Sequence, residues 1–148
     1  MTPVVVDASI ALDLYTTPLG SPAHMRAIAL FKEIAAHTVK ASVPDHFSIE
    51  CASGVIRYQR RNSKTVTQAN ALEFLNQLDV FQLEYCGMVL DARLVGQWAT
   101  AMNCGAYDAV YLQLARQLDA HLASSDKAQR SAALAFNIAL WEPGVTTT

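Results

Sequence analysis

Short aliphatic runs alternate with longer amphipathic segments along the chain, and this order restricts the fold more than any other feature. Residues 4–6 are three consecutive valines that end at Asp7, a run typical of a parallel strand buried on both faces. Similar short runs lie around residues 40–43, 80–85, 120–123 and 137–140. Strands that alternate with helices predict an α/β domain, with a mostly parallel sheet covered on both faces by helices.

The segments between these runs carry helix signals at their starts and an apolar stripe along one side. Ser21 is a favoured N-cap, and Pro22 fits the first turn of the helix that follows. The apolar face of this helix contains Met25, Ile28 and Phe31. Comparable helical segments span residues 44–61, 65–78, 89–102 and 106–118.

Length, charge and cysteine content narrow the class of protein. The 148 residues fit one domain over residues 1–148, and we expect residues 145–148 to fray. A net charge of −2 gives no overall attraction for nucleic acid, so such binding must use a local patch. The three cysteines form no CxxC pair, which favours a reducing compartment over a zinc or disulfide scaffold.

No segment has the pattern of a membrane span or a leader peptide. Charged residues interrupt every apolar run before the ~18 residues that a transmembrane helix needs. The N-terminus lacks a basic segment before an apolar stretch and a cleavage site. We therefore expect a soluble, cytoplasmic protein that does not contact a membrane.

Two acids follow predicted strands. Asp7 ends the first run, and Asp126 comes after the late run at residues 120–123 and two serines. Ligands of a parallel sheet bind beyond the carboxyl ends of its strands, so both acids are expected at one edge of the sheet. Ser9, two residues after Asp7, could cap the next helix or contact a ligand.

Two more acids lie on predicted helices, at positions that face inward. Asp108 shares a stripe with Tyr111, Leu112 and Ala115, the i+3, i+4, i+7 spacing of a buried helix face. Glu50 falls in the middle of its helical segment, with small residues one turn later that leave room beside it. Neither acid has the pattern of a solvent-facing side chain.

The four acids together favour a divalent cation. A buried carboxylate costs several kcal/mol unless it is neutralised, paired or bound to a cation, and lysine and arginine are scarce near these positions. Clustered carboxylates repel one another unless a cation lies between them. Oxygen ligands, with few histidines and no paired cysteines, favour Mg²⁺ or Mn²⁺ over zinc.

Each acid also has a plainer interpretation. Asp7 and Asp126 are favoured N-cap residues, so each could cap the helix that follows it. Asp108 could be a first-turn acid that interacts with the helix dipole. Glu50 is the hardest to explain in this way because of its place within the segment. The joint occurrence of all four favours a shared site.

Four stretches of the sequence resemble one known family. "VVVDASIAL", "IECASGVI", "YDAVYLQLA" and "LASSDKAQ" together resemble the PIN-domain nucleases, especially VapC-type toxins of bacterial toxin–antitoxin pairs. The resemblance covers residues 4–140, and "YDAVYLQLA" is its most distinctive part. It implies a three-layer α/β/α sandwich with about five parallel strands. It also implies an Mg²⁺- or Mn²⁺-dependent endoribonuclease that hydrolyses RNA phosphodiester bonds.

The resemblance assigns roles and partners as well. The catalytic, metal-binding acids of the family fall on Asp7, Glu50, Asp108 and Asp126. Ser124 takes the place of a small hydroxyl residue that is often Thr, and Ser53 stands where the family often has Asn. VapC-like proteins commonly form homodimers and accept an antitoxin segment between early helices. RNA, a cognate antitoxin and a second copy of the chain are therefore the expected partners.

A basic stripe continues the helix of Glu50, at spacings i, i+3, i+4 and i+7. Its members are Arg57, Arg60, Arg61 and Lys64. Arg57 lies two turns beyond Glu50, about 10 Å along the helix. This stripe, with Lys127 after the last acid, could contact the RNA backbone. A solvated helix end whose cations complement the dipole explains it equally well.

Other functions remain as alternatives. A phosphatase that uses Asp7 as its nucleophile would need a second Asp two residues later, where Ser9 stands. A catalytically silent PIN-fold adaptor that binds RNA or protein is a second alternative. A PIN nuclease of RNA processing, rather than a toxin, is a third. Metal binding and metal-dependent cleavage separate the enzymes from the adaptor.

Overall fold

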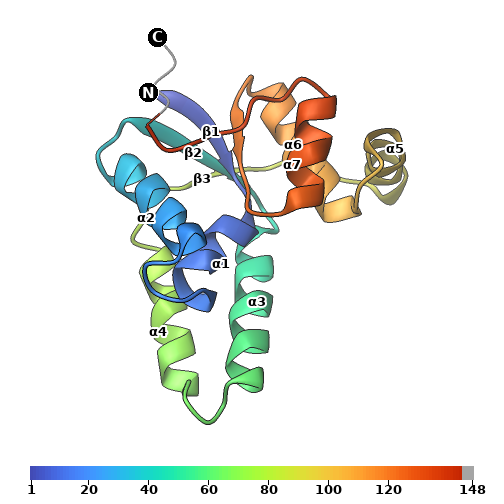
Figure 1. The fold of residues 1–148 in the computed structure, drawn as a ribbon. Helices are drawn as coiled ribbons and strands as arrows, with labels where there is room; N and C mark the ends of the chain where they lie inside the picture. Colours follow the sequence, from blue (N-terminus) through green and yellow to red (C-terminus); the bar gives the residue numbers. More distant parts are fainter. Residues whose placement is uncertain (145–148) are drawn as a thin grey trace.

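The sequence folds into seven helices and four strands within residues 1–144, the part of the chain that the computed structural model describes (Figure 1). The strands are β1 (Thr2–Val6), β2 (Val39–Pro44), β3 (Glu84–Cys86) and β4 (His121–Ala123). The helices are α1 (Ala8–Thr16), α2 (Pro22–Ala35), α3 (Phe47–Arg61), α4 (Gln68–Leu78), α5 (Ala92–Met102), α6 (Ala106–Gln117) and α7 (Lys127–Ala135). The fraying predicted for residues 145–148 lies outside the described residues.

The sheet is parallel throughout, with strand order β3-β2-β1-β4. The predicted α/β fold is confirmed, but the sheet of residues 1–144 has four strands rather than about five. The run at residues 137–140 forms only one bridge, between Leu122 and Leu140. Asn137, two residues after the end of α7, takes a left-handed conformation (φ 58°), and the segment then contacts β4 through two main-chain hydrogen bonds at Leu122. β3 also begins later than predicted, because turns occupy the residues before Leu83.

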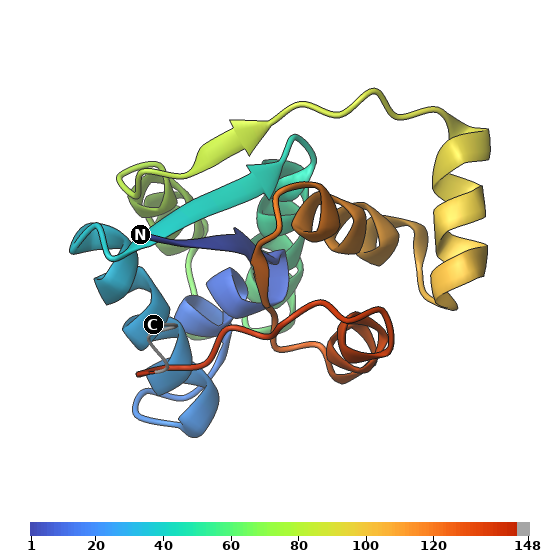
Figure 2. The ribbon, with the colours of Figure 1, turned by 90° about the horizontal axis from the view of Figure 1, so that it is seen from above.

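Helices cover both faces of the sheet. Val4, Val5 and Val6 of β1 are all 0% exposed, and successive strand residues face opposite sides of a sheet. α6 packs against β1, β2 and β4, and α2 packs against β2. Figure 2 shows α5 at the side of the molecule, where it packs against α6. No helix within residues 1–144 combines the length and the apolar character needed to cross a bilayer.

A close contact between α1 and α3 positions the helix that carries Glu50. A Cβ on Gly54 would lie 2.5 Å from Cδ1 of Leu12, so the Leu12 side chain packs directly against the backbone of α3 at this glycine. The space that the sequence leaves beside Glu50 is therefore filled by α1. Because α1 follows Asp7 directly, this contact brings the start of α3 to the end of β1.

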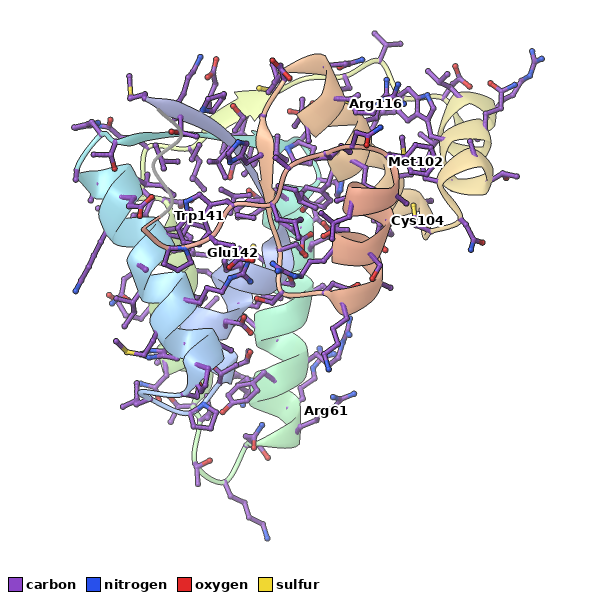
Figure 3. All side chains as sticks on the ribbon, turned by 45° about the horizontal axis from the view of Figure 1, so that its top comes forward. Arg61, Met102, Cys104, Arg116, Trp141 and Glu142 are labelled. Atoms are coloured by element: carbon purple, nitrogen blue, oxygen red, sulfur yellow. The ribbon has the colours of Figure 1, made fainter. Side chains whose placement is uncertain are left out.

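The C-terminal segment is tied to the loop after β4 by a cluster of charged residues; Figure 3 labels Glu142 in this cluster. Glu142 accepts hydrogen bonds from Arg26 of α2 (3.2 Å) and Arg130 of α7 (2.5 Å). Both guanidinium groups also donate to the main-chain carbonyl of Ser124, at 2.8 and 3.2 Å. Burial disfavours the charged form of Glu142, but the two arginines outweigh it and lower the pKa of this carboxyl.

Glu142→Gln removes the charge that pairs with the two arginines, so we expect it to lower the free energy of unfolding. The loss should be about 1 kcal/mol, because partly exposed ion pairs contribute less than buried ones. Urea denaturation at pH 7 measures this loss. The pKa of Glu142 is lowered in the folded protein, so its contribution is present above the pKa of an unfolded glutamate. The contribution should be lost as the pH falls below about 4, where the two proteins become equally stable.

Glu84→Gln provides the matched control. It removes the ion pair between Glu84 and Lys40 (2.8 Å), in which both side chains are more than half exposed. Because such pairs contribute little, the free energy of unfolding should not change measurably. Equal losses of stability in the two variants would contradict the larger contribution assigned to Glu142.

Candidate active site

Asp7 ends β1 and caps α1, and its side chain is only 5% exposed. Its Oδ2 accepts hydrogen bonds from the main-chain N–H of Ser9 (3.1 Å), from the Ser9 hydroxyl and from the Ser124 hydroxyl (3.1 Å). Burial raises the pKa of Asp7, and these hydrogen bonds oppose the rise. The structure thus places both supporting serines of the sequence prediction on one carboxylate oxygen.

Asp126 reaches the same region because β4 lies directly beside β1. Val6 pairs with Ala123, the last residues of the two parallel strands, so the loop after β4 begins beside Asp7. Ser124 is fully buried and joins the two acids: its hydroxyl donates to Asp7 and accepts from the main-chain N–H of Asp126 (3.1 Å). Asp126 is exposed and caps α7 by accepting from the N–H of Gln129 (2.8 Å). Both strand-end acids therefore cap helices and line a common pocket, so the two interpretations do not exclude each other.

Glu50 lies in the first turn of α3. The sequence pattern predicted a position in the middle of the helical segment instead. The hydroxyl of Tyr111 donates to its Oε2 (2.5 Å), and Nε2 of His46 lies 3.4 Å from the same oxygen without hydrogen-bond geometry. Tyr111 is 0% exposed, so this oxygen is held from the core side. Burial raises the pKa of Glu50; the Tyr111 hydroxyl opposes the rise, and the charges of Asp7 and Asp108 add to it.

Asp108 lies in the first turn of α6 and is half-buried. The other members of its predicted stripe are at most 1% exposed, but Asp108 is at the outer end of the stripe and does not face the core as predicted. Nε2 of Gln129 lies 3.5 Å from its Oδ1. Burial raises the pKa of Asp108, and the negative charges of Asp7 and Asp126 raise it further.

All four acids line one pocket of about 430 Å³. They come from four places in the sequence, the ends of β1 and β4 and the first turns of α3 and α6. Ser9, His46, Arg57 and Tyr107 are among the other residues that line it. Within residues 1–144, no lysine or arginine forms an ion pair with any of the four acids. The four carboxyl groups therefore share the pocket with Arg57, but none of them is paired with it.

The donor atoms of this pocket fit a hard divalent cation. The hydrogen bonds described for Asp7, Glu50 and Asp126 each end on one oxygen, Oδ2, Oε2 and Oδ1, which leaves a second oxygen for another ligand. Burial raises the pKa values of Glu50 and Asp108 most, and a cation would relieve the repulsion between neighbouring acids that adds to this rise. No three His, Cys, Asp or Glu side chains in residues 1–144 form a finished metal site. The pocket thus has suitable ligands but is not preassembled around an ion.

Three polar residues of the site were missed as site residues in the sequence. Tyr111 was assigned to the core, although its hydroxyl holds Glu50. His46 and Gln129 were not noticed, yet each lies within one helical turn of an acid, four residues before Glu50 and three after Asp126. That spacing was the available signal, because residues three or four apart are neighbours on a helix.

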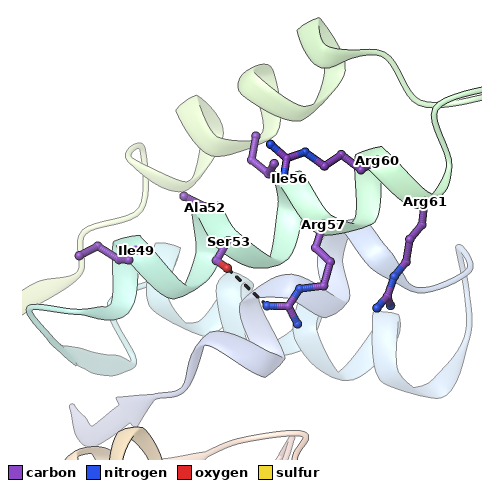
Figure 4. Close-up of a pocket in the computed structure, with 7 residues that line it drawn as sticks. All are labelled: Ile49, Ala52, Ser53, Ile56, Arg57, Arg60 and Arg61. Carbon is purple, nitrogen blue, oxygen red and sulfur yellow. Dashed lines mark hydrogen bonds between the residues drawn. The ribbon is translucent and has the colours of Figure 1, made fainter.

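A second, open hollow of about 670 Å³ runs along α3 and contains Arg57, Arg60 and Arg61 in its lining. Figure 4 shows Arg57 and Arg61 extending to one side of α3 and Arg60 to the other. All three arginines line this one hollow, whereas Lys64 lies beyond the end of the helix at Arg61, so the helical stripe is one residue shorter than predicted. Arg57 lines both hollows, whereas Lys127 is the exposed first residue of α7.

Comparisons with known proteins agree with this architecture. The crystal structure of PAE2754 from Pyrobaculum aerophilum is similar, with a TM-score of 0.65 and 19% sequence identity, over 88% of this chain and 79% of that chain. No curated protein matches the chain in sequence. The sequence model of the PIN domain matches residues 4–134, which is most of the chain. By that match, together with the shared fold, the chain belongs to the PIN domain family.

Proposed function

We propose that this chain is an endoribonuclease that hydrolyses RNA phosphodiester bonds with the help of Mg²⁺ or Mn²⁺. PIN domains are generally nucleases, which supports a hydrolase. The observation that carries the proposal is the pocket lined by four carboxyl groups, none of them ion-paired to a lysine or arginine in the described residues; the pKa values of three, Asp7, Glu50 and Asp108, are raised. We further propose that residues 1–148 act as a single nuclease domain.

The chain's own residues prepare the site for a cation. Asp7, Glu50, Asp108 and Asp126 would hold it. When bound, such an ion supplies Lewis-acid activation of water and of the phosphate group. Ser9 and Ser124 hold the Asp7 carboxylate in one orientation, and Tyr111 does the same for Glu50. These hydrogen bonds reduce the reorganisation that the two acids need when substrate binds.

The arginines beside the pocket supply the attraction for RNA that the net charge of −2 does not. Arg57 lines both the acid pocket and the hollow along α3, so it connects the two. It donates to Ser53 (3.4 Å), which keeps its guanidinium close to the helix surface (Figure 4). We assign Arg57 and Arg61 to phosphates that flank the cleaved bond. Arg60, Lys64 and Lys127 stay predictions of weaker, more distant contacts.

We expect the purified protein to cleave labelled total RNA with Mg²⁺ or Mn²⁺ and not with EDTA. Asp7→Asn and Asp108→Asn keep the shape of each side chain but remove a charged ligand. Each should lower kcat/KM by at least about 100-fold. Asp119→Asn alters an exposed acid outside the pocket and should cleave like the wild type. If the wild type, freed of any co-purified inhibitor, cuts no RNA in either metal, the catalytically silent adaptor becomes the better interpretation.

Changing Arg57→Gln together with Arg61→Gln should weaken RNA binding and its dependence on salt. The plot of log K against log salt has a negative slope, and each lost phosphate contact of a single strand makes it shallower by about 0.7. The pair should therefore make it shallower by about 1.4. Fluorescence anisotropy of labelled RNA in EDTA measures this slope. Arg116→Gln is the control, because Figure 3 shows Arg116 at the opposite end of the molecule from Arg61. A slope that does not change would remove the arginines from the RNA path.

We also propose that the nuclease is a VapC-type toxin that acts in the cytoplasm as a homodimer and is inhibited by an antitoxin. Its sequence motifs and its three free cysteines support this role. Leu19 and Met25, at 88% and 52% exposed, offer apolar surface to a protein partner at α2. A PIN nuclease of RNA processing would share the same acids, so only a cellular experiment separates the two.

Induced expression of the wild type should stop the growth of a bacterial host, because unregulated RNA cleavage blocks translation. Asp108→Asn should not stop growth, and co-expression of the antitoxin should restore growth to cells that carry the wild type. Colony counts after induction measure both effects. Normal growth with a nuclease that is active in vitro would favour a role in RNA processing.

A further inference from the structure

An exposed tyrosine stands at the acid pocket without a part in the proposed hydrolysis. Tyr107 directly precedes Asp108 in the first turn of α6, lines the acid pocket and is 63% exposed. Tyr85 is also exposed, at 47%, but its hydroxyl bonds to Ser48 (2.6 Å) and it lines a different pocket. Tyr107 therefore presents a large aromatic surface where substrate must arrive.

A row of rings supports Tyr107 from the core side. The ring of His46 lies against Tyr107, with centroids 5.3 Å apart, and meets Tyr111 edge-on at 5.0 Å. Tyr111 is fully buried and its hydroxyl is bonded to Glu50. The contact with His46 thus restricts the Tyr107 side chain, so this side chain loses less conformational entropy when a flat ligand binds.

The acid pocket joins two kinds of surface. Its carboxylates lie beside the rings of His46 and Tyr107 and beside Ile49, an apolar residue that is 73% exposed. Its volume of about 430 Å³ is within the usual range for small-ligand sites. A nucleotide has the two matching parts, because its phosphate suits a cation held by carboxylates and its base suits an aromatic face.

We propose that Tyr107, backed by His46, stacks on a nucleobase next to the cleaved phosphate. This inference rests on the proposed nuclease function and narrows its substrate to single-stranded RNA, or to a loop whose base is unstacked from its neighbours. Bases in an RNA duplex stay paired and their flat faces stay covered, so a duplex would not reach the ring. Stacking also predicts tolerance of base identity, since every base has a π face.

The test uses the full chain in EDTA and a short single-stranded RNA built from 2-aminopurine ribonucleotides, whose fluorescence falls when the base stacks. Wild type and Tyr107→Phe should bind with the same quenching. Tyr107→Ala should bind about 5- to 150-fold more weakly, the usual loss for one stacked base, and without the quenching. Tyr85→Ala, an equally truncated tyrosine away from the acids, should behave like the wild type.

Steady-state cleavage with Mg²⁺ separates failure of the stacking site from failure of the nuclease function. We expect Tyr107→Ala to raise KM and change kcat little, and Tyr107→Phe to restore KM. If Tyr107→Ala cleaves with an unchanged KM and keeps the quenching, the stacking site is overturned and the nuclease stands. If Tyr107→Ala leaves RNA binding and cleavage unchanged but alters the apparent mass in gel filtration, the ring belongs to an interface between protein chains. The stacking site is then likewise overturned. If the wild type neither binds nor cleaves RNA, both proposals fall.

Discussion

The Asp7 carboxylate is the group on which the arrangement of the site depends. It is an ionisable group that is only 5% exposed, directly after three strand residues that are completely buried. Burial of a carboxylate carries a large cost unless hydrogen bonds or a cation offset it. One of the donors, Ser124, comes from the loop after β4. The pairing of β1 with β4 is therefore what brings this donor to the buried carboxyl group.

Hydrogen bonds connect Ser124 to the C-terminal segment through two arginines. The carbonyl of Ser124 accepts hydrogen bonds from Arg26 and Arg130, and Glu142 holds both guanidinium groups. Arg26 is itself partly desolvated, and burial lowers its pKa while the charge of Glu142 opposes this. Two arginines and one carboxylate thus position a serine whose hydroxyl serves Asp7. Stability of the fold and geometry of the site are consequences of the same contacts.

Local sequence pattern predicted those parts of the fold that depend on local physics. Continuous burial marked β1, and the Ser21 N-cap was found at the start of α2, because both signals lie within a few residues. The fifth strand and the length of β3 were wrong, because turns occupy the residues before Leu83 and residues 137–140 form only one bridge to β4. Glu50 was placed mid-helix because His46, the N-cap of α3, makes no side-chain cap and leaves no local signal.

The four acids were found from their positions after strands and on helix stripes, but their surroundings were not. Tyr111 reaches Glu50 across 61 positions of sequence and Gln129 reaches Asp108 across 21, so no short-range pattern could reveal these pairs. The basic stripe was predicted one residue too long. Helical spacing was extended past Arg61, where the helix ends, and spacing alone does not fix the direction of a long flexible side chain.

The acids are not held equally, and this difference explains how the pocket suits a cation without being built around one. Asp7 and Glu50 are fixed by buried hydroxyl donors, whereas Asp126 is exposed and Asp108 is half-buried with one long contact. Gln129 links the two looser acids, through its N–H to Asp126 and its side-chain amide to Asp108. Gln129 is itself 0% exposed, and its Oε1 has no hydrogen-bond partner among the described residues. One buried residue, Gln129, therefore links the two more loosely held acids, while buried hydroxyl groups hold the other two.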